Sequence, residues 1–425
     1  MQRLTIKKLG PISDCTIDVK DFMVFTGPQA SGKSTIAKSI FLFNNLKNVL
    51  YLLISKDYSK GKLFQINSLA EQFEKKIKEA VVQAFGRDSF REGTLVEYVY
   101  DNGGIISVEN KKLLPNVTEL TVSISDDLIN SINSLAATVK DNEKDISEIR
   151  DIIENVIFSN EYEIVYIPAG RSLLTMLSSQ INYLYAVMDD QQKNMIDYCT
   201  RCYLEQVLRI KDFFSVSLLQ LAKQTLDSSE YDANKDIIEK AVEFIKNIMH
   251  GEYRVVSGEE RLFITETESV KLNYSSSGQQ EVAWIVNMLF YYMLGKRKTF
   301  FIIEEPESHL FPETQKAVVE LIALVKNGSN KALITTHSPY VLGTVNNLLY
   351  ADCISDGENN GDIDGILSED LWLKFDTLGA YYIENGEPKN IADSEYQDIN
   401  HDVIDGVSGV LNEDYEKLMD VARKE

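Results

Sequence analysis

The sequence predicts an α/β fold, in which a mixed and parallel sheet carries a phosphate-binding loop and a helical lobe is inserted into the chain. Three observations predict it. An apolar segment at 21–26 is followed by a glycine-containing loop and then by apolar residues at helical spacing over 36–43. Two further segments, 300–303 and 331–334, are predominantly apolar, and the first ends in glutamates while the second runs into Thr-Thr-His. Such apolar strands are typical of parallel sheets that are buried on both faces.

The composition is that of an ordinary globular chain with an acidic C-terminal portion. The 425 residues carry a net charge of −22, and residues 351–425 alone hold 20 acidic and 5 basic residues. An acidic surface disfavours sequence-independent binding to nucleic acid, which depends on basic residues that neutralise phosphates. The net charge alone does not exclude a local basic groove. For the acidic portion, a solvated surface is favoured over a docking surface for a basic partner.

The sequence shows no pattern of a membrane-spanning or secreted protein. Its apolar runs stay shorter than 18 residues, and the N-terminal residues alternate like a strand rather than forming a signal peptide. Four cysteines in a chain of this length suit a reducing compartment, so we expect a cytoplasmic protein without membrane contact. Cys199 and Cys202 form a lone C-x-x-C inside a predicted helix, which favours incidental cysteines over a metal site.

The segment at 27–35 is the strongest functional signal. It fits the pattern G-x-x-x-x-G-K-[ST] without departure and reads Gly27-Pro28-Gln29-Ala30-Ser31-Gly32-Lys33-Ser34-Thr35. In such a loop, backbone N–H groups and the positive end of the following helix surround phosphate groups. We expect Lys33 to reach the β- and γ-phosphates and Ser34 to bind Mg²⁺. The sequence therefore predicts that the chain binds a nucleoside triphosphate.

Three glutamates within four residues follow the apolar segment at 300–303. An apolar strand that ends in carboxylates presents them at the carboxyl edge of a parallel sheet, where nucleotides bind. We expect Glu304 to hold Mg²⁺, directly or through water, and Glu305 to orient and polarise the attacking water. The simpler interpretation, a strand that merely ends in solvated acids, is disfavoured by the density of glutamates after a fully apolar run.

Two further motifs complete a nucleotide site. His337 follows the strand at 331–334 and can hydrogen-bond a γ-phosphate. A Ser/Gly turn precedes the apolar helix predicted at 282–294, and Ser276 and Gly278 in this turn can offer donors to an anion. Taken alone, the turn is a helix cap and the histidine is incidental. The order of phosphate loop, signature turn, acidic strand (Walker B) and histidine is that of an ATP-binding-cassette ATPase.

This ordered set resembles the cassette-type AAA ATPases of the SMC/RecF/overcoming-lysogenization-defect group, including ATPase subunits of bacterial anti-phage defence systems. The resemblance covers about residues 1–48 and 253–350, and the matching segments are 4–12, 27–34, 166–171, 276–279, 304–307 and 336–339. It implies an ABC ATPase head with an inserted helical lobe that binds ATP and Mg²⁺ and forms head-to-head dimers or higher oligomers. In such a dimer, ATP on Lys33 of one protomer contacts Ser276 and Gly278 of the other.

The sequence departs from the pattern of this group at several positions. Glu304 stands where the usual Walker B residue is Asp, and Ser275 and Ser277 replace the leucine and the first glycine of the signature. Arg171 and Gln180, which follow a predicted strand that ends in Pro-Ala-Gly, are the candidates for the Q-loop position.

The predicted organisation interrupts the ATPase head with the helical lobe. We expect the N-terminal part of the head at 1–48, a helical and β insertion at 49–160, the helical lobe at 161–252, the C-terminal part of the head at 253–350, and an acidic C-terminal extension at 351–425. The nuclease members of the group carry a metal-binding TOPRIM domain after the histidine. Here a D-x-D at 362–364 lies in Gly/Asn-rich sequence that predicts a loop, so we expect a head without TOPRIM.

These observations lead to one expected function and two alternatives. The expected function is that of an ATPase whose nucleotide-dependent dimerisation regulates a separately encoded effector in bacterial anti-phage defence. The first alternative is a RecF/SMC-like ATPase of DNA repair or chromosome maintenance that binds DNA directly, which the acidic charge balance disfavours. A transporter nucleotide-binding domain is disfavoured by the early phosphate loop and the long middle insertion.

Overall fold

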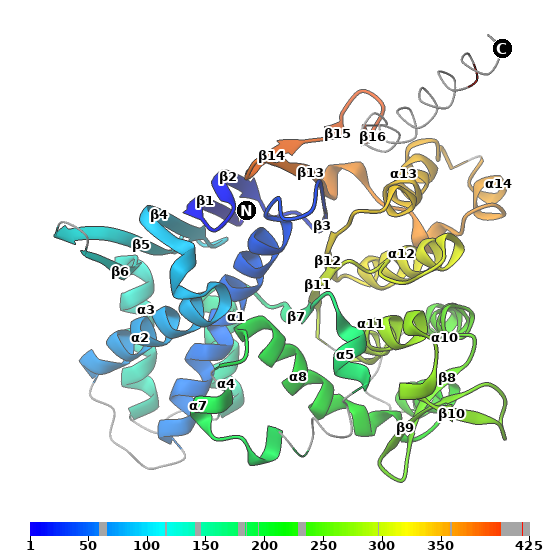
Figure 1. Cartoon of the computed structure of the whole chain (residues 1–425), viewed down its shortest axis with the longest axis horizontal. Helices are drawn as coiled ribbons and strands as arrows, with labels where there is room; N and C mark the ends of the chain where they lie inside the picture. Colours follow the sequence, from blue (N-terminus) through cyan, green and yellow to red (C-terminus); the bar gives the residue numbers. More distant parts are fainter. Residues whose placement is uncertain are drawn as a thin grey trace.

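A mixed sheet forms the centre of the computed structural model, which describes residues 1–58, 66–114, 117–140, 146–176, 183, 185–193, 195–227, 235–295, 297–357, 359–400 and 419. The strand order is β14-β13-β3-β12-β11-β7 (Figure 1), and every neighbouring pair is parallel except β13 and β14. This confirms the expected α/β fold with a mixed and parallel sheet. The strands are β3 (Phe22–Thr26), β7 (Glu163–Ile167), β11 (Thr299–Glu304), β12 (Lys331–Thr335), β13 (Leu378–Glu384) and β14 (Glu387–Asn390).

Both faces of this sheet are buried, which explains why its central strands are apolar. Along β3, Phe22 and Val24 belong to one hydrophobic core, whereas Met23 and Phe25 belong to the other. This alternation follows from the two-residue period of a strand. Helix α1 packs into the second core, and α11, α12 and α13 pack into the first. These helices are α1 (Lys33–Tyr58), α11 (Ser277–Met293), α12 (Pro312–Asn327) and α13 (Pro339–Cys353).

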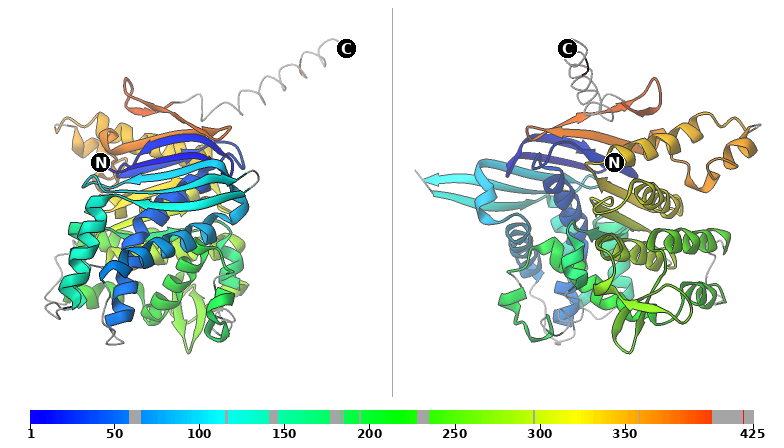
Figure 2. Two further views of the ribbon diagram at one scale, coloured as in Figure 1. Left: turned by 90° about the vertical axis from the view of Figure 1, so that its left-hand side faces the viewer. Right: turned by 45° about the vertical axis from the view of Figure 1, so that its right-hand side comes forward.

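An antiparallel sheet with the order β2-β1-β4-β5-β6 contributes to the second core together with α1. Figure 2 shows this sheet lying above helices α2 and α3. β1 pairs with β4, so that Leu4 faces Tyr98, and the sequence division between 1–48 and 49–160 therefore runs through a single sheet. The elements are β1 (Arg3–Leu9), β2 (Ile12–Asp18), β4 (Phe90–Val99), β5 (Ile105–Leu114), β6 (Val117–Ile124), α2 (Ile66–Phe85) and α3 (Asp126–Lys140).

The middle of the chain is mainly helical and ends in a small antiparallel sheet with the order β10-β9-β8. Cys199 and Cys202 lie on α8, in agreement with the predicted helix. The elements are α4 (Ile146–Ile152), the π-helix η2 (Ile153–Ile157), α5 (Arg171–Met176), α7 (Asp190–Lys193), α8 (Tyr198–Ile210), η3 (Lys211–Ser215), α9 (Leu218–Asp227), α10 (Lys235–Met249), β8 (Glu252–Val256), β9 (Glu259–Phe263), β10 (Ser269–Lys271) and η4 (Leu272–Tyr274).

Part of the expected C-terminal extension belongs to the mixed sheet. β13 pairs in parallel with β3, so residues 378–384 lie beside the strand that leads into the phosphate loop. The D-x-D falls within the short helix α14 (Asn360–Asp364) instead of the predicted loop. Gln180 and residues 401–418 lie outside the described residues. In the ranges given above, no helix is both long enough and apolar enough to cross a membrane.

Candidate functional site

The strand order brings the sequence motifs together at one edge of the mixed sheet. β3, β12 and β11 are neighbours and run in parallel, so their carboxyl ends lie side by side. The phosphate loop follows β3, His337 follows β12, and Glu304 is the last residue of β11. Motifs that are far apart in the chain thereby become neighbours.

The phosphate loop requires glycine at two positions. Gly32 has a φ of +111° and Gly27 a φ of +137°, which residues with a side chain rarely adopt. At Gly27 space excludes a Cβ as well, because it would lie 2.2 Å from the Ile383 carbonyl oxygen, and at Gly32 a Cβ would lie 2.3 Å from Ile12 Cδ1, so that this side chain would have to move. The loop is therefore confined between β2 of the antiparallel sheet and β13 of the mixed sheet.

Lys33 is the first residue of α1 and is 5% exposed. Its Nζ donates hydrogen bonds to the carbonyl oxygens of Gly27 and Pro28, at 2.9 and 2.8 Å. Burial lowers the pKa of the ammonium group, and the carboxylates of Glu305, Glu307 and Glu304 oppose that shift. The side chain is thus folded back onto its own loop, where two carbonyl oxygens act as its acceptors.

The other loop residues divide into exposed and buried groups. Those with exposed side chains are Pro28, Gln29, Ala30 and Ser34, whereas Thr35 is half-buried. Ser31 is buried, and its Oγ finds no hydrogen-bond partner in the described part of the chain. Because an unpaired buried polar group costs about 1–3 kcal/mol, this hydroxyl marks a place where a ligand atom fits.

The two glutamates at the end of β11, Glu304 and Glu305, have different surroundings. Glu304 is buried, and its Oε2 accepts a hydrogen bond from the Ala169 N–H at 3.3 Å, whereas its Oε1 has no partner among the described residues. Glu305 is partly exposed and has a φ of +43°, in the left-handed region that non-glycine residues seldom adopt. Its N–H donates to the Thr335 carbonyl at 2.9 Å, and its Oε2 accepts from Ser308 Oγ at 3.1 Å. A buried carboxylate with a free oxygen thus lies next to an accessible one.

His337 lies beside Glu305, with its Nε2 3.7 Å from Glu305 Oε1. Its backbone is held by Glu307, whose Oε1 accepts hydrogen bonds from the His337 N–H at 2.8 Å and from Thr336 Oγ1 at 2.7 Å. The other carboxylate oxygen of Glu307 is buried and unpartnered in the ranges that the structure describes. Glu307 therefore positions the segment that carries His337, a role that the spacing of the glutamates alone did not predict.

The polar groups of Ser276 in the signature turn form hydrogen bonds with Gln279, within the same segment. Ser276 caps α11, because its Oγ accepts a hydrogen bond from the Gln279 N–H at 3.3 Å and its own N–H donates to Gln279 Oε1 at 3.1 Å. Gly278 packs on the segment after the glutamates, where a Cβ would lie 2.7 Å from the His309 carbonyl oxygen. Ser276 itself is exposed, so its hydroxyl is accessible from outside the chain.

Arg171 is a fully buried residue that connects the signature helix to the glutamates. It begins α5, and its guanidinium donates hydrogen bonds to the carbonyl oxygens of Glu281, Glu304 and Glu305. Burial lowers its pKa, and the Glu281 carboxylate opposes that shift. The sequence suggested Arg171 only for the Q-loop position; the signal that could have identified this role is an arginine directly after the Pro-Ala-Gly turn that ends a buried strand.

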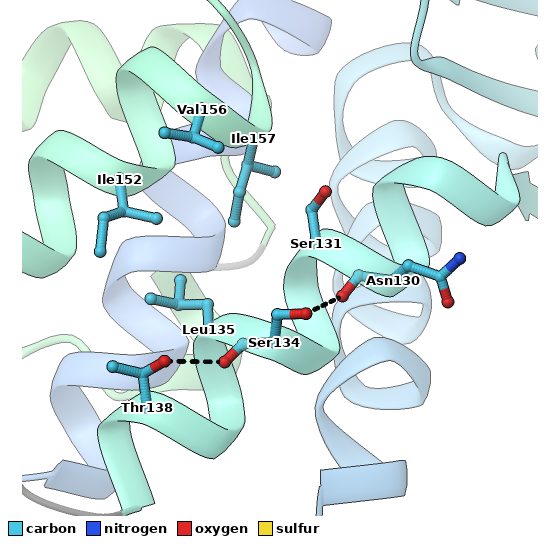
Figure 3. A pocket seen from close by; sticks show the side chains of 8 residues that line it. All are labelled: Asn130, Ser131, Ser134, Leu135, Thr138, Ile152, Val156 and Ile157. Atoms are coloured by element: carbon cyan, nitrogen blue, oxygen red, sulfur yellow. Dashed lines mark hydrogen bonds between the residues drawn. The ribbon is translucent and has the colours of Figure 1, made fainter.

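A separate hollow of about 290 Å³ lies between α3 and the α4–η2 segment (Figure 3). It is lined by uncharged side chains, namely Asn130, Ser131, Ser134, Leu135, Thr138, Ile152, Val156 and Ile157. The hydroxyls of Ser134 and Thr138 donate to backbone carbonyls of their own helix. A triphosphate needs cationic or N–H donors, so the hollow does not suit a nucleotide, and the sheet edge is the better candidate.

The fold and the site define a P-loop ATPase whose phosphate loop, acidic strand end and histidine share one edge of a parallel sheet. Residues 1–342 match the family model of the AAA ATPase domain. The chain belongs to this family, and its motif order is that of an ABC-type ATPase. A comparison with curated proteins found no match.

Among solved structures, the chain is similar to ATPase heads and cassettes. An SMC head bound to the C-terminal winged-helix domain of ScpA is 12% identical with a TM-score of 0.43, and 92% of this chain and 96% of that chain are covered. The SMC head domain from Thermotoga maritima is 14% identical with a TM-score of 0.37, covering 92% and 97%. A dimeric ATP-binding cassette bound to ADP and Pi is 13% identical with a TM-score of 0.31, covering 92% and 97%. These likenesses are distant.

Proposed function

We propose that the edge formed by β3, β12 and β11 binds ATP with Mg²⁺ and hydrolyses it. Phosphate oxygens replace the Gly27 and Pro28 carbonyls as acceptors for Lys33, and one of them supplies the partner that Ser31 Oγ lacks. Ser34 and Glu304 would hold Mg²⁺, which would supply positive charge beside the phosphate groups. The free, buried Oε1 of Glu304 fits this role, because a carboxylate oxygen is a ligand that Mg²⁺ prefers.

The chemical step is assigned to the residues that follow β11 and β12. Glu305 orients and polarises the attacking water, and His337, 3.7 Å from it, contacts the γ-phosphate. The observation that carries the proposal is the convergence of a buried lysine with three carboxylates at the carboxyl edge of a parallel sheet. Lys33, Glu305 and His337 are therefore the proposed catalytic residues.

Replacing Glu305 by Gln tests the assignment, because it removes the charge and keeps the shape. We expect turnover to fall about a hundredfold to ten-thousandfold while ATP still binds. Glu119→Gln, on the exposed surface of β6, is the matched control and should hydrolyse ATP at the wild-type rate. Wild-type turnover by Glu305→Gln would remove Glu305 from the mechanism.

We propose further that two copies associate face to face through the signature turn, so that Ser276 and Gly278 of one copy contact ATP on Lys33 of the other. Three large aromatic residues are exposed around this turn: Tyr274 at 79%, Phe311 at 71% and Tyr340 at 56%. Exposed aromatic groups of this kind favour burial in a protein interface.

The three aromatic residues lie on neighbouring segments of one surface. Gly278 packs on His309, two residues before Phe311. Gln315 joins this segment to the one with Tyr340, since its Nε2 donates to the Leu310 carbonyl at 2.9 Å and its Oε1 accepts from Ser338 Oγ at 2.6 Å. A second copy that covers this surface would bury the aromatic residues and reach the nucleotide edge.

Phe311→Asp tests the interface without weakening the fold. Phe311 is the N-cap residue of α12, a position where Asp is favoured, so the substitution should not unfold the helix. We expect ATP-dependent dimerisation, measured by sedimentation in a Glu305→Gln background, to weaken at least about tenfold. Tyr396→Asp, which removes an exposed aromatic residue outside these three segments, should dimerise normally. Equal dimerisation of both variants would contradict the proposed interface.

The proposed biological role is ATP-driven regulation of a separately encoded effector in bacterial anti-phage defence, in the cytoplasm. It rests on the resemblance of the motif set to ATPase subunits of such systems. Co-purification of the native chain with a nuclease or toxin subunit, in a manner that depends on ATP, would support it. ATP-dependent retardation of DNA at physiological salt, without such a subunit, would instead favour the RecF/SMC-like alternative.

A further inference from the structure

The guanidinium of Arg171 joins three separate parts of the site and has no exposed surface. Nη1 donates hydrogen bonds to the carbonyl oxygens of Pro168 and Glu304, both at 2.6 Å. Nη2 donates to the Glu305 carbonyl at 3.0 Å, and Nε donates to the Glu281 carbonyl at 3.1 Å. One planar group thus connects the end of β7, the end of β11 and the helix α11.

Glu281 completes the connection from the side of α11 and is 1% exposed. Its Oε2 accepts a hydrogen bond from the Arg171 N–H at 3.1 Å and lies 3.4 Å from Arg171 Nε. Its Oε1 accepts from the Ser172 N–H at 3.0 Å. Thr175 Oγ1 adds a bond to the Gln280 carbonyl at 3.1 Å. The first turns of α5 and α11 are therefore tied together through buried contacts.

The other end of the connection is the strained peptide that carries Glu305. The left-handed φ of this residue is held by two backbone contacts on opposite sides. Its N–H donates to the Thr335 carbonyl, and its carbonyl accepts from Arg171 Nη2. Because the backbone direction decides where the carboxylate points, a shift of the guanidinium changes the aim of Glu305.

The signature turn and Glu281 belong to the same helix, α11. Ser276 is the N-cap of α11, and Glu281 lies about one and a half turns further on. The capping box between Ser276 and Gln279 fastens the turn to the first turn of the helix. The helix α11 therefore connects the signature turn to the groups that hold Arg171.

We propose that Arg171, together with Glu281, is a positioning residue that links contact at the signature turn to the orientation of Glu305 in the same chain. This inference rests on the proposed function, in which the signature turn contacts nucleotide bound to a second copy. Each copy then aligns its own Glu305 only when its signature turn is engaged. Hydrolysis at the two sites of a dimer becomes mutually dependent.

Arg171→Lys is the primary test, since it keeps the charge but loses the fork that reaches several carbonyls at once. We expect kcat for ATP to fall about a hundredfold, because a small misplacement of a catalytic group has an effect of this size. The affinity for ATP and the dimerisation induced by a non-hydrolysable ATP analogue should stay within about twofold of wild type, since Arg171 does not contact the phosphate loop in the bonds described above.

Arg254→Lys is the matched control. Arg254 also pairs with a buried glutamate, through Nε and Glu252 Oε1 at 2.9 Å, but it lies on β8. This variant should keep the wild-type kcat. Parallel losses of kcat, ATP affinity and thermal stability in Arg171→Lys would show a merely structural role and overturn the inference. An unchanged kcat in this variant would overturn it as well.

Glu281→Gln provides a second, milder test that decides the matter if Arg171→Lys does not fold. It retains the shape of the side chain and removes the charge opposite Arg171, so kcat should again fall at unchanged ATP affinity. An unchanged kcat in a folded Glu281→Gln protein would refute the connection. Wild-type protein without ATPase activity would instead refute the proposed function itself, and that result is visible before any variant is made.

Discussion

Helix α1 carries two buried lysines, Lys33 in the candidate site and Lys47 away from it. A comparison of the two shows what distinguishes a binding site from a structural contact. Lys33 donates to two carbonyl oxygens of the phosphate loop. Lys47 donates to the carbonyl oxygens of Asn160 and Tyr162, at 2.7 and 2.5 Å. Both are at most 5% exposed, and burial lowers the pKa of both ammonium groups. The bonds made by the two side chains are therefore nearly the same.

The two lysines differ in the carboxylates that surround them. Near Lys47, Glu154 is already paired with two arginines. Near Lys33, Glu304 and Glu307 each keep one buried oxygen that has no partner among the residues described. A buried lysine with a lowered pKa is thus not a site by itself; the unfilled polar atoms around Lys33 indicate where a ligand belongs.

The largest expected difference between the two lysines is in nucleotide binding. Lys33→Ala should weaken the affinity for ATP with Mg²⁺ about tenfold to a hundredfold, because hydrogen bonds to a charged group are lost. Lys47→Met should bind with wild-type affinity. Titration calorimetry of the three proteins measures the difference, and equal weakening by both substitutions would show that the two lysines are not distinct.

A smaller effect is expected from the glycine that precedes Lys33. Gly32→Ala should lower the free energy of unfolding by about 2–3 kcal/mol, because it combines a positive φ with a Cβ only 2.3 Å from Ile12 Cδ1. Gly103→Ala shares the positive φ but has open space around it, so it should lose about 1 kcal/mol. Urea unfolding gives both values. Equal losses of unfolding free energy in the two variants would show that the close packing around Gly32 does not contribute to the cost of its replacement.

The smallest effect is the pH dependence of stability that the ionisation of Lys47 causes. Burial lowers its pKa from 10.5 to about 8, so between these values the unfolded chain binds more protons than the folded chain. The penalty for burying the ammonium group is fully present below pH 8 and is relieved as the pH rises. Between pH 8 and 9, the free energy of unfolding of wild type relative to Lys47→Met should therefore rise by about 1 kcal/mol.

The comparison with Lys47→Met isolates this titration. Buried groups whose pKa is raised by burial, such as Cys202 and Tyr98, lose stability at alkaline pH in both proteins, so their contribution cancels. A relative stability that stays constant or falls between pH 8 and 9 would contradict the lowered pKa of Lys47.

The sequence was sufficient for those parts of the fold that local patterns determine. The expected strand at 21–26 corresponds to β3, and the helix begins at Lys33 because the glycine loop ends there. Glu304 lies at the end of β11, as the apolar run before it predicted. In each case the signal is carried by residues that are adjacent in the chain.

Pairings between distant segments were not predictable from periodicity. The acidic composition of residues 351–425 predicts an extension, yet β13 lies beside β3, because strand pairing depends on which edge is free in the folded sheet. The return of Lys33 to the carbonyls of its own loop also depends on the folded backbone. The sequence offers Arg171 as a candidate for the Q-loop position, but its bonds to Glu281 and Glu305 arise only when three elements meet.

The most direct test of the nucleotide site is the steady-state rate of ATP hydrolysis with Mg²⁺, measured for wild type, Lys33→Ala and Lys47→Met in one experiment. The account predicts turnover by wild type and by Lys47→Met, and a rate for Lys33→Ala that is at the background level. Hydrolysis by Lys33→Ala at the wild-type rate, or its absence from folded wild-type protein, would contradict the assignment of this edge of the sheet.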